Sequence, residues 1–110
     1  MAWGEFPMGA CRTSFVQTAS KMIHVGQCRL VSIHAVLTGA NATTVKVFDT
    51  ATSGAASAAN EMARLILQGA PSFSPTMIEF DMHGVIATNG LYLEISSGAG
   101  EGAAVSVEFN

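Results

Sequence analysis

The sequence predicts an all-β protein, an antiparallel β-sandwich with a jelly-roll-like fold and about seven or eight strands. Apolar and polar residues alternate in five separate runs, which is typical of strands with one buried face. Stretches rich in glycine, alanine and serine separate these runs, as turns do. The 110 residues show no break in composition, which indicates one domain.

The five clear runs are, in chain order, CRLVSIHAVL, TTVKVFDT, TMIEFDM, GLYLEIS and AAVSVEF. Every second residue of each run is apolar, and we expect these residues to face the core. The expected inward residues are Val31, Ile33, Ala35, Leu37, Val45, Val47, Ile78, Phe80, Met82, Leu91, Leu93, Ile95, Val105, Val107 and Phe109. The last two runs are joined by a flexible Gly-rich stretch and are expected to form a terminal hairpin.

Two further segments are less regular. TSFVQT, at 13–18, predicts a short strand, and MARLILQ, at 62–68, fits either a strand or a short helix. A strand is favoured at 62–68 because its neighbours are strands and because Gly69 and Pro71 end the run.

Residues 1–12 are predicted to form an extended N-terminal arm ahead of the sandwich domain, 13–110. Trp3, Phe6 and Met8 lie in a stretch too short and too interrupted by glycine and proline for a regular element. We expect this arm to dock on a neighbouring subunit or partner. The alternative is ordinary packing on its own sandwich.

The composition points to association. The chain is 49% hydrophobic and only 12% charged, against roughly 25% charged residues in an average soluble domain. The net charge of −3 and the scattered basic residues argue against a nucleic-acid partner. No apolar run is long enough to span a membrane, and the first residues do not resemble a secretory signal. We therefore expect cytoplasmic synthesis and contacts with other proteins.

The two cysteines, Cys11 and Cys28, do not have the spacing of a metal motif. Reduced thiols are the favoured interpretation. A disulfide that fixes the N-terminal segment to the first long strand is the alternative.

Glu79, Asp81 and His83 follow one another at every second position, so their side chains share one face of the predicted strand. Such a set binds a divalent cation if a neighbouring strand or subunit adds a ligand. The alternative is a solvated or interface surface, with His83 already in the turn before Gly84. No cofactor is expected.

No catalytic frame surrounds the histidines, His24, His34 and His83, and no nucleophile elbow is present in the sequence. An enzyme is therefore the least favoured class.

Interface residues are expected on the polar faces of the strands. Phe48 and Tyr92 are aromatic residues on such faces, and aromatics are enriched at the centres of interfaces. We expect them, with His34, Glu94 and the arm residues, to contact other subunits or a partner protein. The outer face of the terminal hairpin is the expected contact surface. Coverage of Phe48 and Tyr92 by loops is the alternative.

The phrases TTVKVFDTAT and SPTMIEFDMHGVIATNGLYLEISSGAGEGAAVSVEF give the chain a resemblance that covers residues 28–110. It resembles the small all-β virion proteins of tailed bacteriophages, particularly marine and cyanobacterial ones. That resemblance implies a capsid decoration or cement protein, a structural protein located on the capsid surface after assembly in the host cytoplasm. It also implies a homo-oligomer, expected to be a trimer, that bridges copies of the major capsid protein.

A different virion part is the alternative function: a head-fibre or tail-associated adhesin module that binds a host glycan. It requires an exposed aromatic platform beside polar groups. An enzyme subunit that uses Glu79, Asp81 and His83 is the third class.

Overall fold

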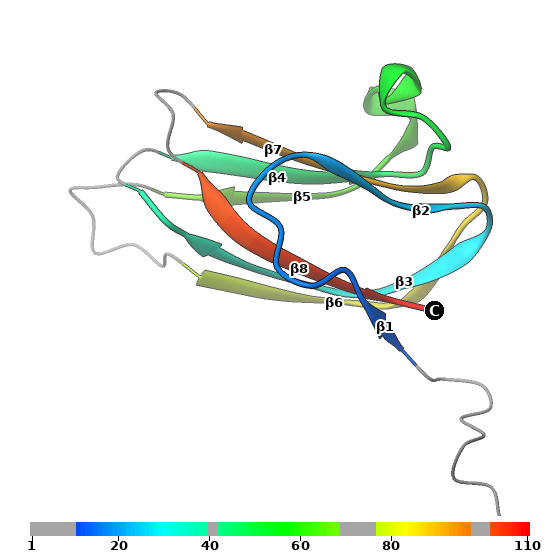
Figure 1. Cartoon of the computed structure of the whole chain (residues 1–110), viewed down its shortest axis with the longest axis horizontal. Coiled ribbons are helices and arrows are strands. Elements are labelled where there is room, and N and C mark those ends of the chain that lie inside the picture. The colour runs from blue at the N-terminus through cyan, green and yellow to red at the C-terminus, as the bar shows by residue number, and fades with distance from the viewer. Residues whose placement is uncertain (1–10, 40–41, 69–76, 98–101) are drawn as a thin grey trace, which may run out of the picture.

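The computed structural model describes residues 11–39, 42–68, 77–97 and 102–110. It shows eight strands in two antiparallel sheets, which confirms the all-β sandwich (Figure 1). The strands are β1 Arg12–Thr13, β2 Lys21–Val25, β3 Cys28–Leu37, β4 Thr43–Phe48, β5 Glu61–Leu67, β6 Met77–Ala87, β7 Gly90–Ser97 and β8 Ala103–Phe109. Two short 3₁₀ turns, η2 Ser53–Ala55 and η3 Ala58–Asn60, connect β4 to β5.

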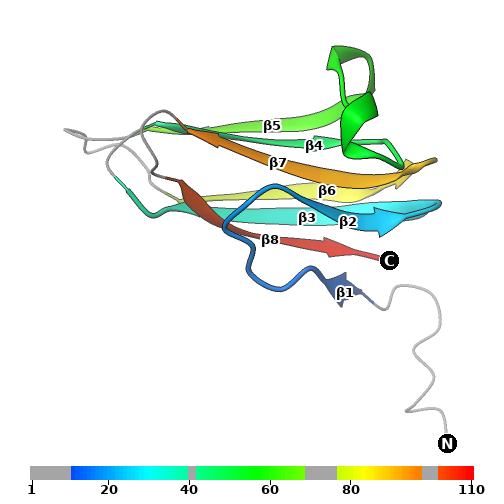
Figure 2. The ribbon, with the colours of Figure 1, turned by 45° about the horizontal axis from the view of Figure 1, so that its top comes forward.

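The strand order is that of a jelly roll. One sheet has the order β1-β8-β3-β6 and the other has the order β2-β7-β4-β5. First and last strands pair, then second and seventh, third and sixth, and fourth and fifth, as in one long ribbon folded over itself. Figure 2 shows the resulting two layers.

The core lies between the inner faces of the two sheets. Most of the apolar residues expected to face inward do so and are buried: Ile33, Ala35, Val45, Val47, Leu91, Leu93, Val105, Val107 and Phe109. Leu37, Ile78, Met82 and Ile95 pack against this core and are partly buried. Each apolar side chain removed from water contributes about 1.5–3 kcal/mol of favourable burial free energy, so this double layer is what holds the sheets together.

The expected terminal hairpin is wrong. β7 pairs with β2 and β4, whereas β8 pairs with β1 and β3 in the other sheet. Alternation reports which side chains are buried, and it carries no information about which strands are neighbours. Tyr92 and Glu94 therefore do not share an outer face with Ser106 and Glu108, because the two pairs lie on opposite sheets.

A bulge at the start of β3 changes which residues are buried there, so the pattern differs from the prediction. The pairing of β3 with both neighbours shifts between Leu30 and Ser32. Leu30 is fully buried, while Val31 is only half-buried. The extra residue of a bulge reverses the alternation on one side of it, so Leu30, and not Val31, faces the core.

The strand that contains Glu79 is longer than expected. His83 does not begin a terminal turn, because β6 continues to Ala87 after a bulge. His83 and Gly84 adopt positive φ angles of 58° and 74° there, and the carboxylate of Asp81 accepts the His83 N–H at 2.8 Å. Phe80 is 45% exposed and not buried as expected, because β6 is an edge strand among the strands that the structure describes.

The predictions for the irregular segments had mixed outcomes. The strand favoured at 62–68 is confirmed as β5. The strand expected at 13–18 is wrong, since the sheet contains only β1 and an isolated bridge from Gln17 to Val105. Between them Phe15 has a φ of 58°, and Phe15 and Val16 are exposed. β2 was not predicted, because a bulge between Met22 and His24 breaks its alternation.

The backbone is closely packed around Gly90, the first residue of β7. Its φ is 155°, and a Cβ added there would lie 2.6 Å from the carbonyl oxygen of His24 and 2.7 Å from that of Thr50. We expect Gly90→Ala to lower the free energy of unfolding by about 2–4 kcal/mol in denaturant titrations, from backbone strain and overpacking. Gly54→Ala, where a Cβ meets no atom within 4 Å, is the control and should change it by less than about 1 kcal/mol. Equal effects of the two changes would contradict this account.

Asp49 ties the end of β4 to the turn between the two sheets. Its carboxylate accepts the N–H groups of Thr88, Asn89 and Gly90 at 3.0, 2.7 and 3.4 Å. Burial acts to raise the Asp49 pKa, but the hydrogen bonds from Asn89, Thr88 and Gly90 together outweigh it and hold the pKa below its ordinary value.

The lowered pKa makes this turn sensitive to acid. The Asp49 carboxylate stabilises the fold at pH values above its unfolded-state pKa, and this stabilisation is lost as the pH falls through the lower folded-state pKa. We expect Asp49→Ala to cost about 1–3 kcal/mol near pH 7, because three N–H groups lose their acceptor. The loss should shrink below pH 4 when unfolding is measured across the pH range. A pH-independent loss would count against a role for the charge.

Candidate functional site

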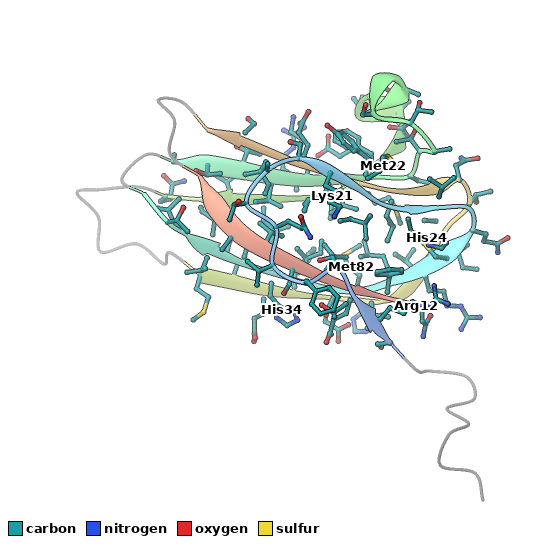
Figure 3. The ribbon with its side chains drawn as sticks, in the orientation of Figure 1. Arg12, Lys21, Met22, His24, His34 and Met82 are labelled. Atoms are coloured by element: carbon teal, nitrogen blue, oxygen red, sulfur yellow. The ribbon has the colours of Figure 1, made fainter. Side chains whose placement is uncertain are left out.

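A polar network crosses the outer face of the sheet β8-β3-β6. Ser32 and His34 of β3 lie opposite Glu108 of β8 and Glu79 of β6, respectively, in the strand register. His34 Nδ1 is 3.2 Å from Glu79 Oε2, and His34 Nε2 is 3.1 Å from Ser32 Oγ. Ser32 in turn donates a short hydrogen bond to Glu108. Figure 3 shows His34 pointing away from the opposite sheet.

The three contacts of this network require three protons. The Ser32 hydroxyl supplies the one that Glu108 accepts, so His34 Nε2 must donate to Ser32 and His34 Nδ1 to Glu79. All three contacts are therefore hydrogen bonds at once only when His34 carries a proton on both ring nitrogens. In that state one positive charge lies between two carboxylates and joins three strands.

The network lowers the pKa of Glu108, the carboxylate at its end. The hydrogen bond from Ser32 is the largest cause holding the pKa of Glu108 below its usual range. Burial acts against this, and His34 acts in the same direction as Ser32.

The order serine, histidine, carboxylate is also that of a nucleophilic triad. Here, however, Ser32 gives its proton to Glu108 and not to the imidazole. β3 is also a central strand with ladders on both sides, so its backbone N–H groups are not arranged around a reacting oxygen. The geometry favours a role in holding the strands together over nucleophilic catalysis.

The residues considered as cation ligands do not converge. Glu79 contacts His34, whereas Asp81 contacts its own neighbour His83, with Oδ2 and Nδ1 3.5 Å apart. Within the part of the chain that the structure describes, no three His, Cys, Asp or Glu side chains are placed to hold a metal ion.

Two open hollows adjoin the network and share His34 and Glu79. The first has a volume of about 190 Å³ and is mostly apolar, with Val16, Ala35, Val36, Met77 and Ala104 in its lining beside Ser106. The second has a volume of about 420 Å³ and is lined in addition by Val31, Ser32, Phe80, Asp81 and Glu108. The second hollow therefore holds three carboxylates and one imidazole.

The expected interface aromatics are placed differently. Phe48 is only 4% exposed, so its prediction as an outward contact residue is wrong. It ends β4, beside the connection that carries η2 and η3, and its ring lies 6.1 Å from that of Tyr92. Tyr92 is half-buried. The alternative of coverage from within the chain accounts for Phe48, and the pair does not form an exposed aromatic platform.

The other predicted contact residues are divided. Glu94 lies on the outer face of the second sheet, 4.0 Å from Lys46 Nζ. Trp3, Phe6 and Met8, and with them nearly all of the predicted arm, lie outside the described residues, while Arg12, its last residue, already belongs to β1.

The cysteines do not form the alternative disulfide. Cys11 is exposed and Cys28 is buried, and these two described residues are not bonded to each other. Burial raises the pKa of the Cys28 thiol, with a further contribution from the charge of Asp49.

Exposed apolar side chains are concentrated at the two edges of the sandwich. Phe15, Val16 and Val25 belong to the edge formed by β2 and the segment that begins at β1. Ile66 of β5 and Met77, Phe80, Val85 and Ile86 of β6 belong to the opposite edge. Among the described residues, Val36 is the one exposed large hydrophobic away from both edges. Sequence reasoning missed this surface, because alternation does not reveal which strands are edges.

Comparisons with known proteins add no relative. No protein family, curated protein or solved structure matches the chain. In the described part of the chain, no helix has the length and apolar character needed to cross a membrane.

The network predicts a change in the titration of Glu108. We expect Ser32→Ala to move the Glu108 pKa up toward its ordinary value, because the largest cause of the lowering is removed. Side-chain carboxyl NMR across a pH series measures this. The matched control is Ser106→Ala. Ser106 lies on β8, two residues before Glu108 and on the same face, so its loss should leave the Glu108 titration as in the wild type. An unchanged Glu108 pKa in Ser32→Ala would show that the hydroxyl does not set it.

Proposed function

We propose that this protein is a structural virion protein of a tailed bacteriophage. In this proposal it is a decoration or cement protein that oligomerises, as a trimer, and stabilises the head by bridging copies of the major capsid protein. The observation that carries the proposal is the concentration of exposed apolar residues on two unlike edges of the sandwich. A protein that bridges needs two contact surfaces, one for each neighbour.

The fold and the surface support this role in different ways. Jelly rolls occur in viral capsid proteins, although a fold by itself does not define a function. Apolar patches of this kind mark interaction sites, and monomeric proteins rarely keep several of them. Two unlike edges also suit the heterologous contacts from which a closed trimer is built.

The adhesin alternative has less support. A glycan site of that class uses an exposed aromatic ring beside polar groups. Phe48 is buried, and Tyr92 is half-buried against it. The exposed rings of Phe15 and Phe80 lie at the two edges of the sandwich and not on a sheet face.

Addition of the purified protein to expanded phage heads tests the role. We expect saturable binding, measured by co-sedimentation, and a trimer in solution by light scattering. Replacing Phe15 and Val16 of one edge with serine should weaken association, since both side chains are exposed and their loss leaves the core intact. The matched control is Thr18→Ala, an exposed position in the same segment. A strictly monomeric protein that does not bind heads would refute the proposal, and glycan-array binding would favour the adhesin.

A further inference from the structure

The strand β6 has an open pairing edge. It pairs with β3 on one side and ends the sheet order on the other. Its first half, Met77–Asp81, follows β3 in regular register, and the bulge at Met82–Gly84 interrupts the strand after it. This half is five residues long, and Figure 1 shows β6 at the margin of its sheet. Such an edge is a template for an added strand.

The side chains of this half combine two kinds of chemistry. Met77 is 64% and Phe80 45% exposed, so the edge offers apolar surface. Glu79 and Asp81 lie on the outer face, with side chains 73% and 68% exposed. An added strand therefore meets two carboxylates with an aromatic residue between them.

A second copy of the same strand does not fit this edge well. In a two-fold antiparallel pair, residues opposite each other have side chains on the same face. An axis through Glu79 pairs all five residues of Met77–Asp81 and places Glu79 opposite its own copy, and an axis through Phe80 places Glu79 opposite Asp81. An axis through Ile78 avoids both contacts but pairs only three of the five residues. Like charges directly opposite each other destabilise a pair, so these carboxylates act against self-pairing.

We propose that the free edge of β6 binds an extended segment of a different protein as an added strand. The segment carries Lys or Arg opposite Glu79 and Asp81, and an apolar residue opposite Phe80. Its long basic side chains reach the second hollow, where Glu108 adds a third carboxylate.

The chain itself offers no such segment. A strand with this pattern needs two basic residues separated by one position, because only every second side chain shares a face. No two basic residues of this protein have that separation, since they are Arg12, Lys21, Arg29, Lys46 and Arg64. The occupant is therefore another chain and not a second copy. This inference rests on the proposed function, in which it names the chemistry by which one neighbour is recognised.

A synthetic peptide tests the edge directly. The isolated, isotope-labelled protein is titrated with Ac-Thr-Lys-Val-Lys-Val-Thr-amide and followed by amide NMR. We expect shift changes centred on Met77–Asp81, and weaker binding as salt is raised from low to high concentration. The same peptide with both lysines replaced by glutamate should not bind. A version N-methylated at alternate residues should also fail, because it keeps the charges but not the backbone donors.

Protein variants separate the charges from the fold. The double variant Glu79→Gln, Asp81→Asn should bind the lysine peptide about 2- to 30-fold more weakly, as two cross-strand charge pairs are lost. Glu94→Gln, on the outer face of the other sheet, is the matched control and should bind like the wild type. If the double variant does not fold, the salt dependence and the N-methylated peptide decide the question with the wild-type protein.

Three results would overturn the assignment. They are shift changes centred on β5 or β1, equal binding by the N-methylated peptide, and concentration-dependent self-association of the wild type through Met77–Asp81. Peptide failure with intact head binding would refute the edge assignment alone. Peptide binding by a protein that does not bind heads would refute the virion role and leave the edge assignment standing.

Discussion

Burial of alternate side chains between two sheets is the constraint on which every other feature of the protein depends. It places residues such as Leu93 and Val107 in the core and leaves their sequence neighbours on the outer faces. The polar network around His34 exists because β3 is the central strand between β8 and β6. The exposed apolar edges exist because an open sandwich has strands with only one neighbour.

The edges show how the protein manages that exposure. β6 is long and partly apolar, which by itself would favour uncontrolled pairing. The bulge at His83 and Gly84 shortens its flat part, and Glu79 and Asp81 place negative charge along it. On the other edge, the hydroxyl of Ser14 accepts the N–H of Val107 and the chain bulges outward at Phe15. Both edges are therefore interrupted, but by different means.

The predictable part of the fold is the part with local causes. The strands β3, β4, β7 and β8 follow from short-range alternation, and the inward positions of Val45 and Leu91 follow with them. Strand pairing is not local. The fold of the whole chain decides whether the last strand pairs with its sequence neighbour or with β1 and β3. The expected hairpin failed for that reason. The bulges at Val31 and His83 were missed because they insert only one and two residues, respectively, which do not change the composition of the run.

The same distinction explains the outcome for the site. Glu79 and His34 were identified separately as outward residues, but their contact depends on the register of β3 against β6. Phe48 was misassigned because alternation gives the face of the strand on which a residue lies, whereas its burial depends on what the rest of the fold places over that face. The apolar edges could not be predicted from the sequence, because the strand order is required to know which strands lie at an edge.

The crossing between β7 and β8 has a consequence for how the molecule forms. β1 and β3 find their shared partner only in the segment 103–109, so the sheet β1-β8-β3-β6 joins strands from nearly the whole described chain. Long-range pairing of this kind makes folding slow, because the loops must close before the contacts that stabilise them are made. A nascent chain that lacks β8 has no strand between β1 and β3, so this sheet assembles late. The apolar edges formed by β1 and β6 are therefore present in one sheet only after β8 has been made and has paired.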